Sequence, residues 1–305
     1  MATNKLKHER TIWIDIVQPT PEDIEILSGA YPYIHPLNLE DLLSPIERPK
    51  LDIDDSYLFV VLHFPVWDAQ QRLTRSREVD LILGRGYVIS IHDGSLKPLT
   101  TLFHMCEQNA IFHDELLGGG APHTFYVIID RLVDYVLPIL RKVDANIRDI
   151  EENIFTSDPR EIIRNITLVR RDIISLRRII RQQVPVVERL EQTNHPILHE
   201  ELEEYFGDIV DHIYRARDII DENAEVIASL AETADTLASH RINEVMRILT
   251  VISVIMLPLT LVSSVYGMNV NLPLDANPNA FIIISGVMVV MAAAMLVYFR
   301  RRNWL

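Results

Sequence analysis

The chain has 305 residues and a formal net charge of −14, from 43 acidic and 29 basic side chains. This acidic balance argues against a nucleic-acid partner and favours attraction of cations. The single cysteine, Cys106, excludes an internal disulfide and fits a small buried apolar side chain in a reducing compartment.

The first 120 residues predict a mixed α/β domain. Residues 11–16 alternate as a strand does, and the segment from Pro19 to Asp23 has the capping residue, proline and acids of a helix start. Residues 36–43 predict another short helix. Three segments rich in Val, Ile, Leu and aromatic residues are expected to be neighbouring strands of one sheet: 57–66, 77–83 and 87–92.

From residue 96 onwards the pattern becomes helical. A helix is expected over 96–112, and the run from Gly118 to Gly120 is the clearest break in the chain. Apolar residues at three and four spacing then predict a helix over 125–154, with a bend at Pro138, and another over 158–190. One more helix is expected after these. It starts near Thr193 and has no clear stop signal before Tyr266. We interpret it as a stalk that begins in water and ends across a membrane.

Two uncharged apolar runs, 248–266 and 280–299, are each long enough to cross a bilayer as a helix. Arg241, Arg247 and the arginines at 300–302 flank these runs, whereas residues 267–279 contain no Lys or Arg. Because cytoplasmic flanks are the basic ones, both termini are expected in the cytoplasm. The amino-terminal segment has no apolar core like that of a signal peptide, which agrees with this orientation.

Charge is divided unevenly between two of the predicted helices. Acids far outnumber bases over 197–240, whereas arginines dominate 160–189. One reading is a pair of solvated helices that partly neutralise each other. The other is that stalk carboxylates converge across subunits and bind a divalent cation, since hard cations take oxygen ligands.

The first apolar run carries most of its polar residues on one helical face. At 100° per residue, seven positions share an arc of about 100°: Asn243, Met246, Thr250, Ser253, Leu257, Thr260 and Ser264. Such a stripe serves either helix packing or a wet pathway built from several copies. Two spans per chain are too few to enclose a pore, so transport would require a symmetric oligomer.

The outer end of this run reads Tyr266-Gly267-Met268-Asn269, which resembles the GMN signature of the CorA family of divalent-cation transporters. The setting is also similar to the family pattern, in segments that extend over nearly the whole chain. These are Asn243-Glu244-Val245-Met246, Leu257-Pro258-Leu259-Thr260, the ending from Tyr298 to Leu305, and Glu47-Arg48-Pro49-Lys50 upstream.

The resemblance implies a homopentamer in which an α/β cytoplasmic domain is followed by a long stalk helix and two C-terminal transmembrane helices. The expected parts are the α/β domain (1–120), cytoplasmic helices (121–196), stalk (197–247), first span (248–266), external GMN loop (267–279), second span (280–299) and basic tail (300–305). The resemblance also implies that Mg²⁺ is both the transported ion and the regulatory ion, and no organic cofactor is expected.

The family pattern also suggests residue roles. Asn269, with Gly267 and Met268, forms the external mouth, where neutral amides accept hydrogen bonds from a hydrated ion. Gly267 is expected to allow a sharp turn after the helix. Leu249 joins Asn243, Met246, Leu257 and Thr260 at pore-lining positions. Three stalk acids are candidate regulatory metal ligands: Asp208, Glu232 and Asp211.

The loop after Asn269 departs from the family pattern. Many members have an acid in a Met-Pro-Glu-like segment, whereas this chain has Asp275 in a different setting, where it is expected to collect cations at the external mouth instead. Zinc transporters of the related ZntB branch share GMN, so transport of Zn²⁺, Co²⁺ or Ni²⁺, with or without proton coupling, stays an alternative. A membrane-tethered sensor or scaffold is another. An enzyme is not favoured, since His195 and His199 lack the His-Glu-x-x-His context and no phosphate-binding Gly loop accompanies a Lys.

Overall fold

The computed structural model describes residues 3–9, 11–44, 46–68, 73–198, 203–268, 273, 278–302 and 304. These residues form two compact units, Met1–Ala231 and Glu232–Leu305. Helix α8 contributes to both. The strands are β1 (Thr3–His8), β2 (Thr11–Val17), β3 (Lys50–Ile53), β4 (Tyr57–Asp68), β5 (Leu73–Gly84) and β6 (Tyr87–His92). The helices are α1 (Pro21–Ala30), α2 (Pro36–Asp41), α3 (Lys97–Gln108), α4 (Ala110–Gly118), α5 (Ala121–Asp134), α6 (Val136–Asn153), α7 (Pro159–Glu191), α8 (Glu203–Tyr266) and α9 (Ala280–Arg301).

The first unit is built on one mixed sheet. Its described strands form a six-stranded sheet in the order β1-β2-β6-β5-β4-β3. Strands β2 and β6 are parallel, with Ile14 opposite Ile89, and the other neighbours are antiparallel. The three predicted central strands and the strand at 11–16 are therefore confirmed as members of one sheet.

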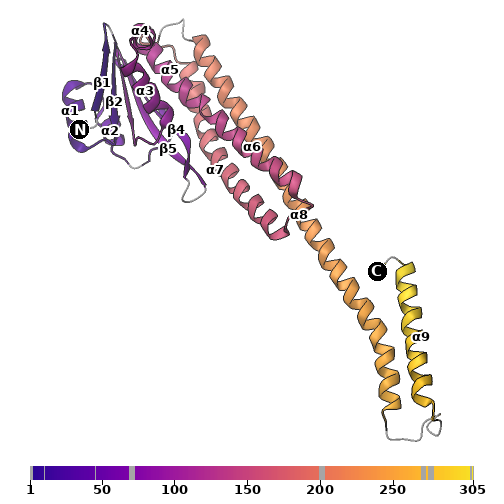
Figure 1. Ribbon diagram of the computed structural model, residues 1–305. Coiled ribbons are helices and arrows are strands. Elements are labelled where there is room, and N and C mark those ends of the chain that lie inside the picture. Colours follow the sequence, from indigo (N-terminus) through magenta and orange to yellow (C-terminus); the bar gives the residue numbers. More distant parts are fainter. Residues whose placement is uncertain are drawn as a thin grey trace. The chain divides into compact units, whose positions relative to one another are not determined.

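Helices cover both faces of this sheet (Figure 1). One face packs its Ile, Val and aromatic side chains against α1 and α2, in a core that includes Phe59, Ile82 and Ile89. The other face presents side chains such as Trp13, Leu58 and Leu81, which are fully buried, towards the layer that contains α5 and α7. Burial on both faces explains why the central strands are almost continuously apolar.

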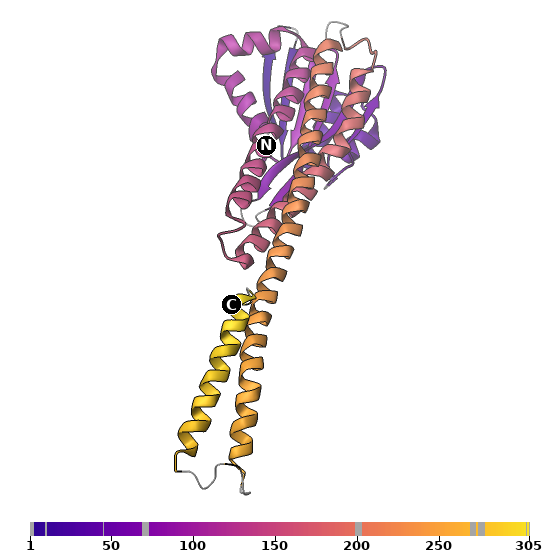
Figure 2. The ribbon, with the colours of Figure 1, turned by 90° about the vertical axis from the view of Figure 1, so that its right-hand side faces the viewer.

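The second helical layer continues beyond the sheet as a bundle of α6, α7 and the first part of α8 (Figure 2). Helix α7 buries an apolar stripe that includes Ile166, Ile173 and Ile180. Helix α8 buries Phe206, Ile213 and others on the matching face, and the Arg177 guanidinium lies 2.7 Å from the Asp221 carboxylate. The predicted basic and acidic helices do pair in this way.

The structure corrects several local predictions. Strands β1 and β3 were not predicted, and Asp52 lies within β3. The helix expected over 96–112 is two helices, because the Asn109 side chain accepts hydrogen bonds from the Ile111 and Phe112 amides and starts α4. The helix expected over 125–154 is divided at Tyr135 into α5 and α6.

In the second unit, α8 and α9 lie side by side in both views (Figures 1 and 2). Both helices are long and apolar enough to cross a membrane. The predicted ends at Tyr266 and Ala280 match the ends of the described helices. The proline inside α8, Pro258, does not interrupt it.

Candidate functional site

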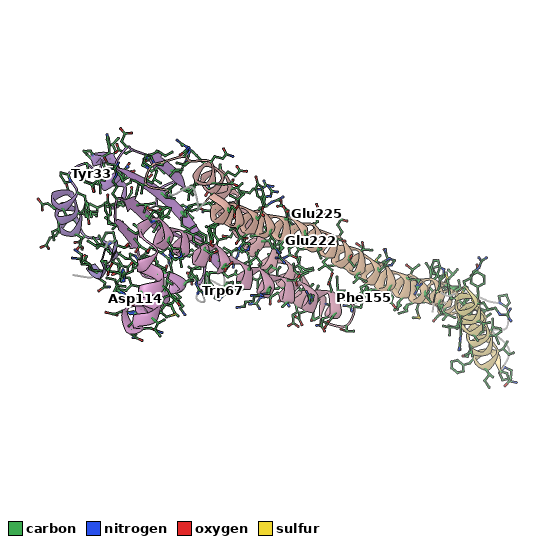
Figure 3. All side chains as sticks on the ribbon, turned by 90° about the horizontal axis from the view of Figure 1, so that it is seen from above. Tyr33, Trp67, Asp114, Phe155, Glu222 and Glu225 are labelled. Carbon is green, nitrogen blue, oxygen red and sulfur yellow. The ribbon has the colours of Figure 1, made fainter. Side chains whose placement is uncertain are left out.

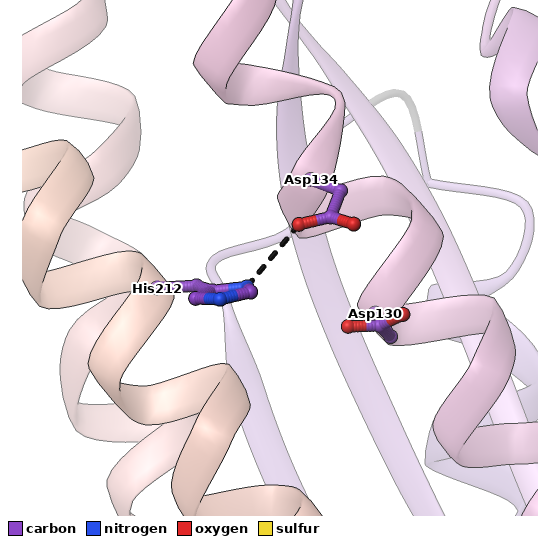
Figure 4. A group of neighbouring side chains, drawn as sticks. All are labelled: Asp130, Asp134 and His212. Carbon is purple, nitrogen blue, oxygen red and sulfur yellow. Dashed lines mark ion pairs between the residues drawn. The ribbon is translucent and has the colours of Figure 1, made fainter.

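An acidic cluster in the first unit brings two helices together around one histidine. Asp130 and Asp134 lie four residues apart on α5, and His212 lies on α8 (Figure 4). One ligand atom from each lies within 4.8 Å of the others, and all three side chains are half-buried. This is the spacing of side chains that could share a cation.

The imidazole of His212 is placed between carboxylates. Its Nδ1 lies 3.2 Å from Asp134 Oδ1, and its Nε2 lies 3.8 Å from Asp208 Oδ1. The contact with Asp134 is close but not aligned as a hydrogen bond, and Nδ1 has no hydrogen-bond partner among the described residues. This nitrogen therefore keeps a lone pair or a proton for a ligand.

The field in the cluster is strongly negative. Burial, and then the neighbouring Asp134 carboxylate, raises the pKa of Asp130 above its ordinary value. Burial and the charges of Asp130 and Asp208 raise the pKa of the Tyr126 phenol to about 12. Burial is the larger cause of both shifts, and the neighbouring carboxylates add to it; a bound cation would offset the repulsion between these carboxylates.

The donor set limits the chemistry. The carboxylate oxygens of the cluster suit Mg²⁺. The imidazole nitrogen suits Zn²⁺, Co²⁺ and Ni²⁺ instead. Of the predicted regulatory acids, Asp208 adjoins this cluster, while Asp211 is exposed on α8 and Glu232 belongs to the second unit. The sequence reasoning missed Asp130, Asp134 and His212. The four-residue spacings of Asp130 with Asp134 and of Asp208 with His212 were the available signal.

In the second unit, the polar stripe of α8 lies on a face that α9 does not cover. The stripe positions Asn243, Met246, Thr250, Ser253, Leu257, Thr260 and Ser264, together with Leu249, are all exposed in the single chain. The less exposed positions are Val251, Ile255, Pro258, Leu259 and Val262. At 100° per residue the centres of these two sets differ by about 150°.

Two stripe hydroxyls are satisfied within the helix. Thr250 and Thr260 donate to the carbonyls of Met246 and Met256, each at 2.8 Å. These bonds lower the cost of placing a threonine in an apolar environment, and they leave the hydroxyl oxygen free to accept a further hydrogen bond.

At the end of α8 the structure describes Gly267 and Met268. The predicted mouth residues Asn269 and Asp275 lie outside the described residues. Gly267 directly follows the end of α8, where its amide donates to the Ser263 carbonyl, and its φ is not in the left-handed region. A Cβ there would lie 3.2 Å from the Ser263 carbonyl oxygen, so close packing is what favours glycine.

A domain with an acidic cluster that could share a cation, followed by two helices long and apolar enough to cross a membrane, is typical of a membrane protein that handles cations. The model of the family described as CorA-like Mg²⁺ transporter protein matches residues 8–301. The chain belongs to this family of divalent-cation transporters.

Two relatives and one solved structure illustrate the similarity. The cobalt/magnesium transport protein CorA of Thermotoga maritima is 28% identical over 295 residues, which cover 96% of this chain and 83% of that protein. The zinc transport protein ZntB of Yersinia pseudotuberculosis is 22% identical and covers 61% of this chain and 57% of that protein. The complete structure of the CorA magnesium transporter from Methanocaldococcus jannaschii superposes with a TM-score of 0.86 at 22% identity, over 99% of this chain and 94% of that one.

These matches confirm the predicted fold class of an α/β domain, a long helix and two C-terminal membrane helices. The chain is an integral membrane protein whose amino-terminal domain is cytoplasmic.

Proposed function

We propose that the chain is a channel-like Mg²⁺ transporter that conducts the ion inward down its electrochemical gradient. The observation that carries this proposal is the polar stripe on the face of α8 opposite α9. Within one chain this face has no covering helix among the described residues. Several copies arranged around an axis would turn the stripe inward and leave α9 towards lipid.

The homopentamer is part of the proposal and rests on the family resemblance. In it, the apolar Met246, Leu249 and Leu257 form the constriction, and the hydroxyls of Thr250, Ser253, Thr260 and Ser264 line the wider parts with Asn243. Asn269 forms a ring of amides at the external mouth, with Gly267 and Met268 supporting it and Asp275 collecting cations nearby. Neutral amide carbonyls suit Mg²⁺ because the ion gives up its bound water reluctantly, and these carbonyls can accept hydrogen bonds from that water without removing it.

The domain boundaries carry over in the same way: α/β domain 1–120, helices 121–196, stalk 197–247, first span 248–266, external loop 267–279, second span 280–299 and tail 300–305. In this proposal the protein is a transporter and not an enzyme, and its transport uses no organic cofactor.

We assign gating to cytoplasmic Mg²⁺. The regulatory ligands are Asp130, Asp134, His212 and Asp208, with Asp211 and Glu232 further along α8. Bound Mg²⁺ neutralises these carboxylates and holds the closed state. When Mg²⁺ falls, their repulsion loosens the arrangement, and α8 carries the change into the span.

Transport of Zn²⁺, Co²⁺ or Ni²⁺, coupled to protons, is the second candidate. The imidazole in the cluster favours it, because nitrogen ligands suit these ions better than Mg²⁺. The zinc transport protein among the relatives supports it as well.

Ion flux into proteoliposomes separates these candidates. We expect Mg²⁺ uptake that does not depend on a pH gradient, and Asn269→Ala should abolish it while assembly persists. Uptake of Zn²⁺ that requires a pH gradient would support the second candidate. Lack of flux of any divalent ion through the wild type would support a membrane-tethered scaffold instead.

A further inference from the structure

A pocket in the first unit lies where β5 and β6 meet the segment that follows α2. Its volume is about 330 Å³, which falls in the range of pockets that hold small organic ligands, roughly 300–1,000 Å³. Strand β5 contributes Glu78 and Asp80 to its lining, and the segment after α2 contributes Leu42, Leu43 and Ile46. The pocket therefore combines buried acids with apolar side chains.

Asp80 is the lining acid that the protein leaves without a partner. The residue is only 5% exposed, and its Oδ1 is buried with no hydrogen-bond partner among the described residues. Within the sheet Asp80 lies opposite Val61 of β4 and Ile91 of β6, whose side chains have no hydrogen to donate. A buried acceptor without a partner costs free energy, and it costs more when it carries a charge.

The other acids of the pocket are compensated within the protein. Glu78 accepts a hydrogen bond from the Glu47 amide at 2.6 Å and lies 3.2 Å from the His63 imidazole. Asp93 accepts a hydrogen bond from the Arg77 guanidinium at 2.9 Å. A cation that enters the pocket therefore has one carboxylate to neutralise.

The neighbouring lysine does not supply this missing charge. Lys50 is held by Asp41 and, at 3.2 Å, by Asp52. Burial, and then the charge of Glu78, raises the pKa of Asp80 well above its ordinary value. A cationic group placed beside Asp80 would offset both effects.

Two other polar atoms of the lining, Ser76 Oγ and Arg77 Nε, are also buried without a partner among the described residues. They lie four and three residues from Asp80 along β5, which is about 10–13 Å of strand. Water can satisfy them, because the charge of the Arg77 guanidinium is already paired. Beside Asp80 the lining is apolar, with Ile91 and Leu42.

This combination fits an organic cation better than a metal ion. Among the described residues Asp80 belongs to no group of metal-ligating atoms close enough to share an ion. A primary ammonium needs only one carboxylate to accept its hydrogen bonds, and a short alkyl chain gains from apolar contact.

We propose that this pocket binds a short aliphatic primary amine, with the ammonium on Asp80 and the methylene groups against the apolar lining. The site is distinct from the acidic cluster on α5 and α8. It gives the cytoplasmic domain an organic ligand and does not depend on which ion the pore conducts.

Calorimetric titration of the purified full chain in detergent with butylamine tests this proposal. Excess Mg²⁺ is present throughout, so that the carboxylates of the α5–α8 cluster are occupied. We expect one butylamine per chain and an amine-dependent rise in the thermal midpoint. The alcohol 1-butanol, which has the same chain without the charge, should bind at least tenfold more weakly. 1,4-Diaminobutane shows whether a second ammonium adds affinity.

Asp80→Asn should weaken butylamine binding at least tenfold and remove the amine-dependent rise. The matched control is Asp114→Asn, because Asp114 stands at the surface of the first unit on α4, is 71% exposed and does not line the pocket (Figure 3). Its butylamine affinity should equal that of the wild type. Three results would overturn the proposal: no amine binding to the wild type in Mg²⁺, equal affinity in Asp80→Asn and the control, or equal affinity for butylamine and 1-butanol.

Discussion

Replacing Asp134 by Asn should weaken inhibition of the transporter by cytoplasmic Mg²⁺. Asp134 and Asp130 present ligand atoms no more than 4.8 Å apart. Two unit charges at that separation repel by about 3.5 kcal/mol at an effective dielectric constant of 20. The Asp134 side chain is 48% exposed, so solvent reduces this figure.

A dication placed between the carboxylates gains from both charges, so losing one should cost roughly 1.4–2.8 kcal/mol, which is 10-fold to 100-fold in affinity. The assay is Mg²⁺ flux from proteoliposomes at increasing Mg²⁺ on the cytoplasmic side. Asp134→Asn should shift the inhibition constant upward by that factor. The amide preserves shape, so folding and expression serve as a direct check on the substitution.

Asp144→Asn is the matched control, because Asp144 forms an ion pair with Arg148 on exposed α6 outside the cluster. Its inhibition constant should equal that of the wild type. Equal inhibition of Asp134→Asn and wild type would refute the assignment of this cluster as the Mg²⁺ sensor, whatever the pore conducts.

Two further predictions concern the buried carboxyl group of Asp80 and the exposure of the polar stripe on α8. Burial, and then the charge of Glu78, raises the pKa of Asp80 well above its ordinary value of 3.8. As the pH rises, Asp80 therefore ionises in the unfolded chain before it ionises in the folded chain. Above about pH 3.8, Asp80 thus lowers the stability of the fold. Asp80→Asn should therefore raise the thermal midpoint at pH 7, with a gain that disappears towards pH 4, and an equal gain at both pH values would contradict this reasoning. In the span, Ser253→Cys should react with a water-soluble thiol reagent much faster than Ile255→Cys, because Ser253 lies on the exposed polar stripe and Ile255 on the less exposed face. The native Cys106 should add little background, because burial raises the pKa of its thiol to about 11 and keeps it protonated. Equal labelling of the two variants would place the stripe away from water.

The larger elements of the fold were predictable because they carry long periodic signals. Helices α7, α8 and α9 and the central strands follow apolar patterns that survive any tertiary context. Strand β1 was missed because Lys5 and Lys7 give it a charged, edge-strand composition that resembles a disordered terminus. Strand β3 is too short for a pattern to emerge.

Helix breaks were the second limit. Asn109 ends one helix and caps the next without a proline or glycine, so the sequence 96–118 looks like a single helix with a polar residue inside. Only the hydrogen bonds of its side chain distinguish a cap from an exposed position.

Only one residue beside the acidic cluster, Asp208, could be predicted from the sequence. Asp208 was a candidate because of its place in an acidic helix, but its neighbours Asp130 and Asp134 belong to a helix that ends about 70 residues earlier. Which face of α8 meets α5 depends on bundle packing, and no local signal specifies it. The polar stripe of α8 was different, because a single helix contains all of its members.

The most direct test of the account is the voltage dependence of Mg²⁺ uptake by the purified chain in proteoliposomes. With equal Mg²⁺ on both sides, below the concentration that closes the channel, and no pH gradient, an inside-negative potential of 100 mV supplies about 4.6 kcal/mol for a divalent ion. A channel predicts net Mg²⁺ entry that stops when the potential is collapsed. Mg²⁺ entry that ignores the potential, or none at all, would contradict the proposed function.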